Sequence, residues 1–417
     1  MNKKVLATAV ALFALCSIDS QAQKPSYVWG GSWAASQQLA EPQNSLPPEL
    51  LNDATLRQVV HLSVGGTALR IHLSNAFGVL PLHLSSVHIA RPLSPASAAI
   101  DPVSDKPVTF SGEPDVIIPA GAEFISDPID IPVAPLSDIA VSIHFDLPPA
   151  GQTGHPGSRA TSYLVHGDSV SAADLPGAQK FDHWYQLAAI DVAALSSTQP
   201  GPSTIVALGD SITDGHGSTT NGNDRWTDVL AQRLQADPQS RNIGVLNQGI
   251  GGNHLLTDGI GPNAVARFDR DVLGQTGVRW LIVLEGVNDI GGFTRLNDPP
   301  PAEHKRFVQQ VLASYEQIIS RSHEAHIKVI GATILPYTDS GYYHPPASNE
   351  ADRQTINSWI RTPGHFDAVI DFDKSIADPH HLDHLAPTYD SGDHLHPSAA
   401  GYRTMGEMIP LSLFSPI

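Results

Sequence analysis

After about residue 200 the chain alternates short apolar runs with amphipathic stretches, and this alternation constrains its fold more than any other feature. Such an alternation predicts a parallel sheet covered by helices, a three-layer α/β/α domain of flavodoxin-like kind. The predicted strands are residues 205–208, 245–246, 280–284, 329–335 and 369–372. The predicted helices are residues 226–234, 264–273, 307–322 and 351–360, followed by a last one after Pro397.

The first part of the chain has a different character. Residues 25–192 are rich in proline, glycine and serine and show short alternating segments without a helical period. Residues 60–64 and 69–73 alternate on either side of Gly65-Gly66, which predicts a hairpin with one buried face. Similar alternation recurs at 82–89 and 139–147. We therefore expect an all-β, jelly-roll-like sandwich over residues 23–200, followed by an α/β domain over residues 201–417.

The first 22 residues have the pattern of a secretory signal peptide. Lys3 and Lys4 precede an apolar run, residues 5–15, that is too short to anchor stably in a bilayer. We expect cleavage after Ala22. The mature chain would lose Cys16, the one cysteine of the sequence. Disulfides, thiol catalysis and thiolate metal sites are therefore excluded from an exported protein, periplasmic or extracellular.

The formal net charge of -18 at pH 7 bears on the partners of the chain. A negative surface repels polyanions at long range, so we expect no nucleic-acid partner and no attraction to an anionic membrane. No stretch after the predicted signal peptide is apolar enough to insert stably into a membrane. The pattern favours a soluble protein that acts on a small molecule, and the sequence leaves the oligomeric state open.

Four segments place polar residues on turns just after apolar runs, where a parallel sheet builds its ligand crevice. These segments are residues 209–211, 247–253, 286–289 and 393–397. Ser211 is a candidate nucleophile, which needs a base, and the base needs an acceptor that fixes its tautomer. His396 and Asp393 lie three residues apart on one turn and can fill these two roles. The Gly-x-Ser-x-Gly elbow of α/β-hydrolases is absent, which indicates a different hydrolase family.

Acyl transfer through a serine also needs donors for the oxyanion of the tetrahedral intermediate. Our candidates are Gly252, Asn288 and the backbone N–H of Ser211, because each stands on a turn after a predicted strand. Glu285 and Asp289 could also act as acids. The simpler interpretation is that they cap a loop or tether the surroundings of the serine.

These segments resemble the sequence blocks of the SGNH hydrolases, the GDSL esterase/lipase family. The matching residues are Gly-Asp-Ser-Ile-Thr-Asp-Gly at 209–215, Asn-Gln-Gly-Ile-Gly-Gly-Asn at 247–253, Gly-Val-Asn-Asp at 286–289 and Asp-His-Leu-His at 393–396. The resemblance covers about residues 203–417. It implies Ser211 as nucleophile, His396 as base, Asp393 as its orienting acid, and Gly252 and Asn288 as oxyanion donors. The β-rich half resembles the extra domain of some secreted bacterial members.

Two other groups of residues have alternative interpretations. The histidine-rich stretch could be a metal-binding segment. Its potential ligands are His380, His381, Asp383, His384, Asp390 and His394. Its spacing fits no common zinc pattern and serine hydrolysis needs no metal, so we expect neither metal nor cofactor. Trp29, Trp33 and Trp184 could form a sugar platform or belong to the core of the sandwich.

The sequence thus predicts a secreted serine carboxylesterase that removes short acyl groups, most plausibly acetyl, from a carbohydrate or another small ester. The alternatives are a long-chain lipase or arylesterase, and a carbohydrate-binding protein with an inactive hydrolase domain. The complete set of four blocks argues against the inactive domain. The connecting segment, residues 196–203, is too short for independent tumbling, so the halves should pack together with loop 155–159 as a candidate wall of the site.

Overall fold

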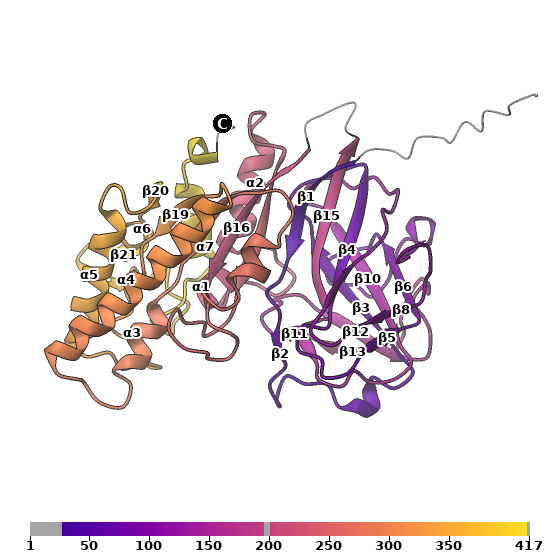
Figure 1. The fold of residues 1–417 in the computed structure, drawn as a ribbon, viewed down its shortest axis with the longest axis horizontal. Coiled ribbons are helices and arrows are strands. Elements are labelled where there is room, and N and C mark those ends of the chain that lie inside the picture. Colours follow the sequence, from indigo (N-terminus) through magenta and orange to yellow (C-terminus); the bar gives the residue numbers. More distant parts are fainter. Residues whose placement is uncertain (1–26, 196–200, 415–417) are drawn as a thin grey trace, which may run out of the picture.

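The computed structural model describes residues 27–195 and 201–414. A strand-rich first part of the chain lies beside an α/β part that begins with β16 (Figure 1). The predicted signal peptide, residues 1–22, and most of the connecting segment lie outside the described residues. Among the helices that the structure describes, none has the length and apolar character needed to cross a membrane.

The α/β part contains a five-stranded parallel sheet, which confirms the fold predicted for this region. Its strand order is β17-β16-β18-β19-β20, the 2-1-3-4-5 order of flavodoxin-like sheets. Every predicted strand is present, although the run 329–335 is a strand only as far as Ala332 and the run 369–372 only as far as Ile370, since Phe372 begins a helix. The strands are β16 (Ser203–Gly209), β17 (Ile243–Gly249), β18 (Val278–Leu284), β19 (Lys328–Ala332) and β20 (Ala368–Ile370).

Two groups of helices pack with this sheet around one hydrophobic core. In the first group α2 contacts α7 and α7 contacts α6, and in the second α5 contacts α3 and α4. The helices are α1 (Ser211–Asp214), α2 (Trp226–Ala236), α3 (Val287–Phe293), α4 (Pro301–Glu324), α5 (Ala347–Arg361), α6 (Phe372–Ile376) and α7 (Ala399–Met408). A small antiparallel pair, β21 (Ala377–Asp378) and β22 (His381–Leu385), and a short 3-10 turn, η4 (Leu411–Phe414), complete this part.

The helix predicted over residues 264–273 is wrong in its first half. Only a π-helical turn, η3 (Asp269–Leu273), forms there. Ala264, Phe268 and Val272 are buried at a helical spacing, which explains the prediction. The backbone N–H of Ala264, however, bonds to the carbonyl of His254 in a neighbouring loop, so the segment begins as a loop tied to the site. Burial spacing alone does not report where the backbone hydrogen bonds go.

The first part of the chain is strand-rich, as predicted, and its two larger sheets share a hydrophobic core. One sheet contains β1 (Tyr27–Ala34), β15 (Leu187–Leu195), β4 (Ala68–Ser74) and β9 (Glu123–Ile125) in that order. The other contains β13 (Gln179–Phe181), β12 (Ser162–His166), β3 (Ala54–His61), β10 (Asp138–Phe145), β6 (Ser86–Ala90) and β7 (Lys106–Pro107). Shorter elements are β2 (Gln38–Leu39), β5 (Leu82–Leu84), β8 (Val116–Ile118), β11 (Thr153–His155), β14 (Trp184–Tyr185), η1 (Pro48–Leu50) and η2 (Pro102–Ser104).

The hairpin predicted around Gly65-Gly66 is wrong. Its two strands belong to different sheets, because β3 pairs with β10 and β12 whereas β4 pairs with β15 and β9. Between them Gly66 donates to the carbonyl of Val133, so the turn is bonded to a third segment. The alternation correctly reported which side chains face the core, but it carries no information on which strand is the partner.

The two parts of the chain meet along β1 and β17. β17 is an edge strand of the parallel sheet, and β1 packs against it. The N–H of Gly31 donates to Thr204 Oγ1 at 3.0 Å, and the N–H of Val245 donates to Ser63 Oγ at 2.9 Å. The β-rich half therefore covers an edge that would otherwise expose unpaired backbone groups.

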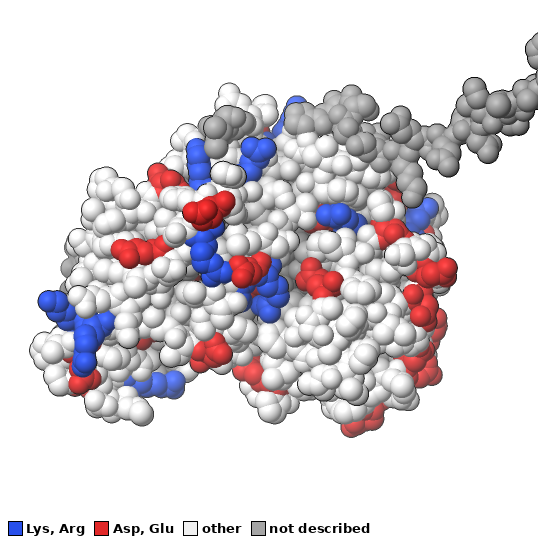
Figure 2. Space-filling model, viewed as in Figure 1, with Lys and Arg blue, Asp and Glu red and all other residues white. Residues whose placement is uncertain are grey.

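The tryptophans considered as a sugar platform lie mostly inside the β-rich half. Trp33 and Trp184 are buried and form an edge-to-face pair with ring centroids 4.8 Å apart. Trp29 packs under the guanidinium of Arg70 at 4.6 Å. On the outside of this half, Figure 2 shows acidic side chains gathered along the right-hand edge and basic side chains in small separate groups.

Candidate active site

Ser211 stands where β16 ends and the short helix α1 begins. The turn is tight, because a Cβ on Gly209 would lie 2.1 Å from Thr213 Oγ1. Asp210 caps the helix, with its Oδ1 accepting the N–H of Ile212 at 2.8 Å. The backbone N–H of Ser211 is thereby one of the first-turn donors of a helix, which have no partner within the helix itself. The serine lies at the carboxyl edge of the sheet, as predicted.

Asp393 and His396 lie on the loop that precedes α7. The carboxylate of Asp390 closes this loop by accepting the N–H groups of Gly392 at 2.8 Å and His394 at 3.0 Å. Asp393 Oδ1 accepts the backbone N–H of His396 at 2.8 Å, so the two residues are fixed relative to each other by backbone as well as side-chain contacts. The spacing of three residues on one turn therefore places the acid beside the base.

The structure brings Ser211, His396 and Asp393 into one hydrogen-bonded chain. Ser211 Oγ lies 2.8 Å from His396 Nε2, and His396 Nδ1 lies 2.6 Å from Asp393 Oδ2. Burial raises the pKa of the Asp393 carboxyl, but the hydrogen bonds and the charge of His396 outweigh it and hold that pKa below its ordinary value. An ionised Asp393 leaves Nε2 of a neutral His396 free to accept the serine proton.

Gly252 and Asn288 line the same pocket as the serine. Gly252 has φ +68, a left-handed conformation that favours glycine, and it turns the chain back after β17. Asn288 is the second residue of α3; its Nδ2 donates to the carbonyl of Asn253 at 2.8 Å and its Oδ1 accepts the hydroxyl of Tyr343 at 2.6 Å. Because a carbonyl only accepts, the amide orientation is fixed and one N–H of Nδ2 remains for a ligand.

The pocket has a volume of about 780 Å³ and lies over the carboxyl ends of β16 and β18. In a flavodoxin-like sheet the strand order reverses between these two strands, which is where the crevice is expected. Beyond the serine, the pair Asp393 and His396 and the two oxyanion candidates, the side chains that contribute to its lining include His216, His254, Ile260, Arg295, Tyr342 and Tyr343. No sequence pattern indicated these residues, because they come from loops far apart in the chain.

A fully buried arginine, Arg267, hydrogen-bonds to residues that precede the serine and to the loop that contains Gly252. Arg267 donates to the carbonyls of Gly209 at 3.0 Å and Gln248 at 2.6 Å, and to Asn253 Oδ1 at 2.8 Å. It also reaches Glu285 Oε1 at 3.3 Å. Burial raises the pKa of Glu285 well above its ordinary value. Glu285 is therefore a structural acid that contacts the arginine rather than the pocket.

Asp289 behaves as the simpler interpretation predicted, as a residue that tethers a loop. Its carboxylate accepts the backbone N–H groups of Leu255 at 2.8 Å and Leu256 at 2.9 Å. Leu255 belongs to the loop that follows Gly252. Asp289 thus fixes the second block of the site to the third.

The histidine-rich stretch does not form a metal cluster of its own. His384 lies between Asp383 at 2.7 Å and Asp339 at 3.2 Å, and His394 pairs with Asp390. Across the residues that the structure describes, three or more potential ligand side chains come together in one place, His216, Asp393 and His396. Both nitrogens of His396 already contact Asp393 and Ser211, which accounts for the cluster without an ion.

Loop 155–159 reaches the α/β part, although it does not contribute to the lining of the pocket. His155 Nε2 lies 2.8 Å from Asp214 Oδ1 at the end of α1. Arg159 reaches His216, which does line the pocket. Loop 155–159 therefore contacts a residue that lines the pocket, His216, and does not itself form a wall of the pocket.

Comparisons with known proteins give one family match and several similar solved structures. Residues 207–404 match the model of the GDSL-like Lipase/Acylhydrolase family. Similar solved structures include a putative lipolytic protein of the G-D-S-L family from Desulfitobacterium hafniense, with 26% identity over 49% of this chain and 97% of that one, and a TM-score of 0.37. The acetylxylan esterase Axe2 from Geobacillus stearothermophilus has 20% identity over 51% and 94% of the two chains, and a TM-score of 0.37. The aryl esterase of M. smegmatis has 16% identity over 49% and 95%, and a TM-score of 0.35. The comparison with curated proteins gave no match.

Proposed function

Because residues 207–404 belong to the GDSL-like lipase/acylhydrolase family and the chain is a serine ester hydrolase, we propose that it removes short acyl groups, acetyl above all, from carbohydrates or other small esters. The observation that carries the proposal is the chain Ser211–His396–Asp393, which opens into a pocket shared with Gly252 and Asn288. Nucleophile, base, orienting acid and donors stand together around one reaction centre.

In the proposed mechanism Ser211 Oγ attacks the acyl carbon of the ester while His396 Nε2 takes its proton. The oxyanion of the tetrahedral intermediate accepts hydrogen bonds from Asn288 Nδ2 and from the backbone N–H groups of Gly252 and Ser211. Collapse breaks the bond to the alcohol, which leaves with the proton from His396. Water, deprotonated by the same histidine, then hydrolyses the acyl-enzyme. Asp393 stays ionised throughout and stabilises the imidazolium.

The lining of the pocket supports an alcohol of carbohydrate type. Its aliphatic side chains are Ile260 and Leu395, and the rings of Tyr342 and Tyr343 add further apolar surface. The rim carries Tyr342, over whose ring the guanidinium of Arg295 lies at 4.4 Å. A tyrosine face beside a cation suits a sugar ring, which presents apolar C–H groups and hydroxyls together.

Chromogenic esters of increasing acyl length, with acetylated xylan as the carbohydrate substrate, test this proposal. We expect kcat/KM to be highest for acetyl and to fall steeply beyond about four carbons, as selection for a short acyl group requires. Faster turnover of long-chain esters would favour a lipase. Turnover of aryl acetates without release of acetate from xylan would favour an arylesterase.

Asn288→Ala should lower kcat by about 10²- to 10³-fold with a smaller change in KM, because its amide donates mainly to the oxyanion of the transition state. Asn349→Ala is the matched control, since Asn349 is also a buried asparagine but bonds to Ile290 and Tyr337 away from the pocket. Steady-state kinetics on an acetyl ester give both constants. A change confined to KM would make Asn288 a substrate-binding residue instead.

Removal of metal ions should leave activity unchanged, because proton transfer through His396 accounts for activation of the serine without an ion. Activity is measured after dialysis against EDTA and again after addition of Zn²⁺. We expect full activity after dialysis. Added zinc should either have no effect or inhibit, because it would compete for the nitrogens of His396. Loss of activity on dialysis with recovery on zinc would contradict this and point to the group His216, Asp393 and His396.

We further propose that the protein is exported and has two domains, residues 23–200 and 201–417, after loss of residues 1–22. The support for export is the sequence pattern of residues 1–22. The support for the division is the change from antiparallel sheets to a parallel α/β sheet on either side of segment 196–200. Mass spectrometry of the protein recovered from a secreting host would show whether cleavage follows Ala22.

A further inference from the structure

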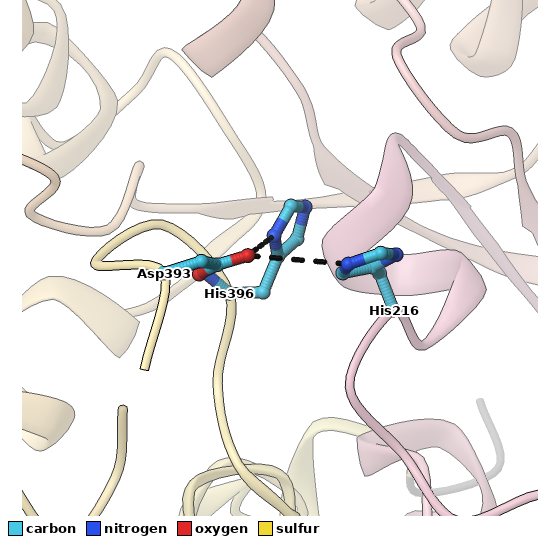
Figure 3. A group of neighbouring side chains, drawn as sticks. All are labelled: His216, Asp393 and His396. Carbon is cyan, nitrogen blue, oxygen red and sulfur yellow. Dashed lines mark hydrogen bonds and ion pairs between the residues drawn. The ribbon is translucent and has the colours of Figure 1, made fainter. Parts of the chain in front are cut away.

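A second histidine lies against the Asp393–His396 pair. The ring centroids of His216 and His396 are 4.1 Å apart, and His216 Nε2 lies 3.9 Å from Asp393 Oδ2, the oxygen that bonds to His396. Figure 3 shows one carboxylate oxygen facing both imidazoles. His216 comes from the segment after α1, whereas the pair comes from the loop before α7. The protonation state of His216 therefore changes the charge next to both Asp393 and His396.

A residue of the β-rich half determines which nitrogen of His216 carries the proton. Arg159 Nη2 lies 3.2 Å from His216 Nδ1, and a guanidinium can only donate, so Nδ1 must be the unprotonated nitrogen. The neutral ring then carries its proton on Nε2, the atom that faces Asp393. Among the described residues, the one side-chain partner of the Arg159 guanidinium is His216, and its Nε is buried without a partner.

The loop that carries Arg159 is bonded to the α/β part before the arginine and at the carbonyl of the arginine itself. Arg159 has φ +49, a left-handed conformation, in a loop whose backbone is bonded across the interface. These contacts are His155 with Asp214, the carbonyl of Ser158 with Arg225, and the carbonyl of Arg159 with the N–H of Asn221. The guanidinium is therefore placed by fixed backbone rather than by a flexible surface loop.

We propose that Arg159 and His216 are positioning residues through which the β-rich half controls the catalytic pair. Arg159 fixes the tautomer of the neutral His216, with Nε2–H on the side of Asp393, and His216 thereby keeps the carboxylate oriented toward His396. The proposal rests on the proposed roles of Asp393 and His396. It assigns to the β-rich half an indirect part in catalysis, although none of its loops contributes to the lining of the pocket.

The charges around His216 explain why an arginine serves this purpose. Burial lowers the pKa of His216, and the neighbouring His396 and Arg159 lower it further, to about 4, against the opposite effect of Asp393 and Asp214. A protonated His216 would lie beside the imidazolium that His396 becomes in each proton transfer, and the two like charges would oppose the step. It would also compete with His396 for the carboxylate of Asp393.

Kinetics of Arg159→Met, His216→Phe and the double variant test the proposal. Arg159→Met should lower kcat by about 10-fold, with KM little changed, because Asp393 and His396 lose part of their orientation. Its kcat–pH profile should also fall more steeply on the acid side, since His216 becomes easier to protonate. The double variant should be no worse than His216→Phe alone, because Arg159 acts through His216. Arg159→Lys should restore most of the activity, and Arg91→Met, an exposed arginine of the same half that contacts Pro132, is the control.

Nitrogen NMR of ¹⁵N-histidine-labelled protein gives a readout independent of turnover. In the full-length protein His216 should show a protonated Nε2 and an unprotonated Nδ1 from pH 8 down to about pH 5, and Arg159→Met should shift its titration upward. An unchanged tautomer and titration in that variant, or additive losses in the double variant, would overturn the proposal. If Ser211→Ala retained activity while the NMR shifts appeared as expected, the proposed function would fail but the Arg159–His216 contact would stand.

Discussion

Ser211→Ala should lower ester hydrolysis by at least about 10³-fold while the protein remains folded. In the proposed mechanism the Oγ atom of Ser211 forms the acyl-enzyme, so its removal abolishes this route. Removal of Oγ leaves His396 Nε2 without its 2.8 Å partner, but that nitrogen lies at a pocket wall where water can bond to it. The free energy of unfolding should therefore change little. Initial rates on an acetyl ester and a thermal unfolding curve measure the two effects.

The control for this variant is Ser320→Ala, which removes an exposed serine from the surface of α4. A serine-directed phosphonate adds a chemical test, because it should label the wild-type protein once, at Ser211, and should not label Ser211→Ala. Activity of Ser211→Ala near the wild-type level, or labelling at another serine, would refute the serine mechanism that we propose.

The α/β fold could be predicted because its signals are local. Each strand of a doubly covered parallel sheet is an apolar run. The turns after β16, β17 and β18 are marked by glycine and a polar residue. Ser211 and Asn288 both stand at such turns, after β16 and β18, so the strand pattern alone places them at one edge of the sheet. The proximity of Asp393 and His396 likewise follows from their spacing on one turn.

The rest of the site could not be predicted, because it depends on contacts between distant segments. Tyr343 orients the amide of Asn288 across 55 positions of sequence, and Arg159 reaches His216 across 57. Neither residue lies in a recognisable pattern. Arg267 is a stronger case: a charged residue in an apolar helical spacing suggests a surface position, whereas the structure buries it completely among carbonyls and carboxylates.

The β-rich half shows the same limit in its strand pairing. Alternation identified the strands near residues 69–73 and 139–147 and their buried faces, but not the partners. Antiparallel sheets contain long connections as well as hairpins, so a glycine pair between two alternating segments is consistent with either. The jelly-roll connection therefore remains a prediction, whereas the strand-rich character is observed.

Residues 201–417 expressed alone should aggregate or unfold, because the β-rich half covers the edge strand β17. In the full-length chain β1 packs against this strand, where Val245 and Leu246 are buried. Loss of the β-rich half exposes both the unpaired backbone of an edge strand and its apolar side chains, a combination that promotes pairing between chains. The fragment also lacks Ser36, which belongs to a fully buried charged cluster in the full-length chain. Ser36 Oγ accepts a hydrogen bond from Arg267 at 2.7 Å and lies 2.7 Å from Asp271 Oδ2.

Size-exclusion chromatography, thermal unfolding and turnover of an acetyl ester compare the fragment with the full-length protein. The matched control keeps both halves of the chain: a protease site is placed within segment 196–200 and cut after folding. The two pieces should remain associated and active, because the contacts between β1 and β17 do not need the covalent link. Coexpression of residues 23–200 with residues 201–417 should likewise restore a soluble, active complex. A monomeric fragment with the unfolding temperature and substrate range of the whole protein would show instead that the β-rich half is an independent module. That result would also contradict the role of Arg159, since the fragment lacks it.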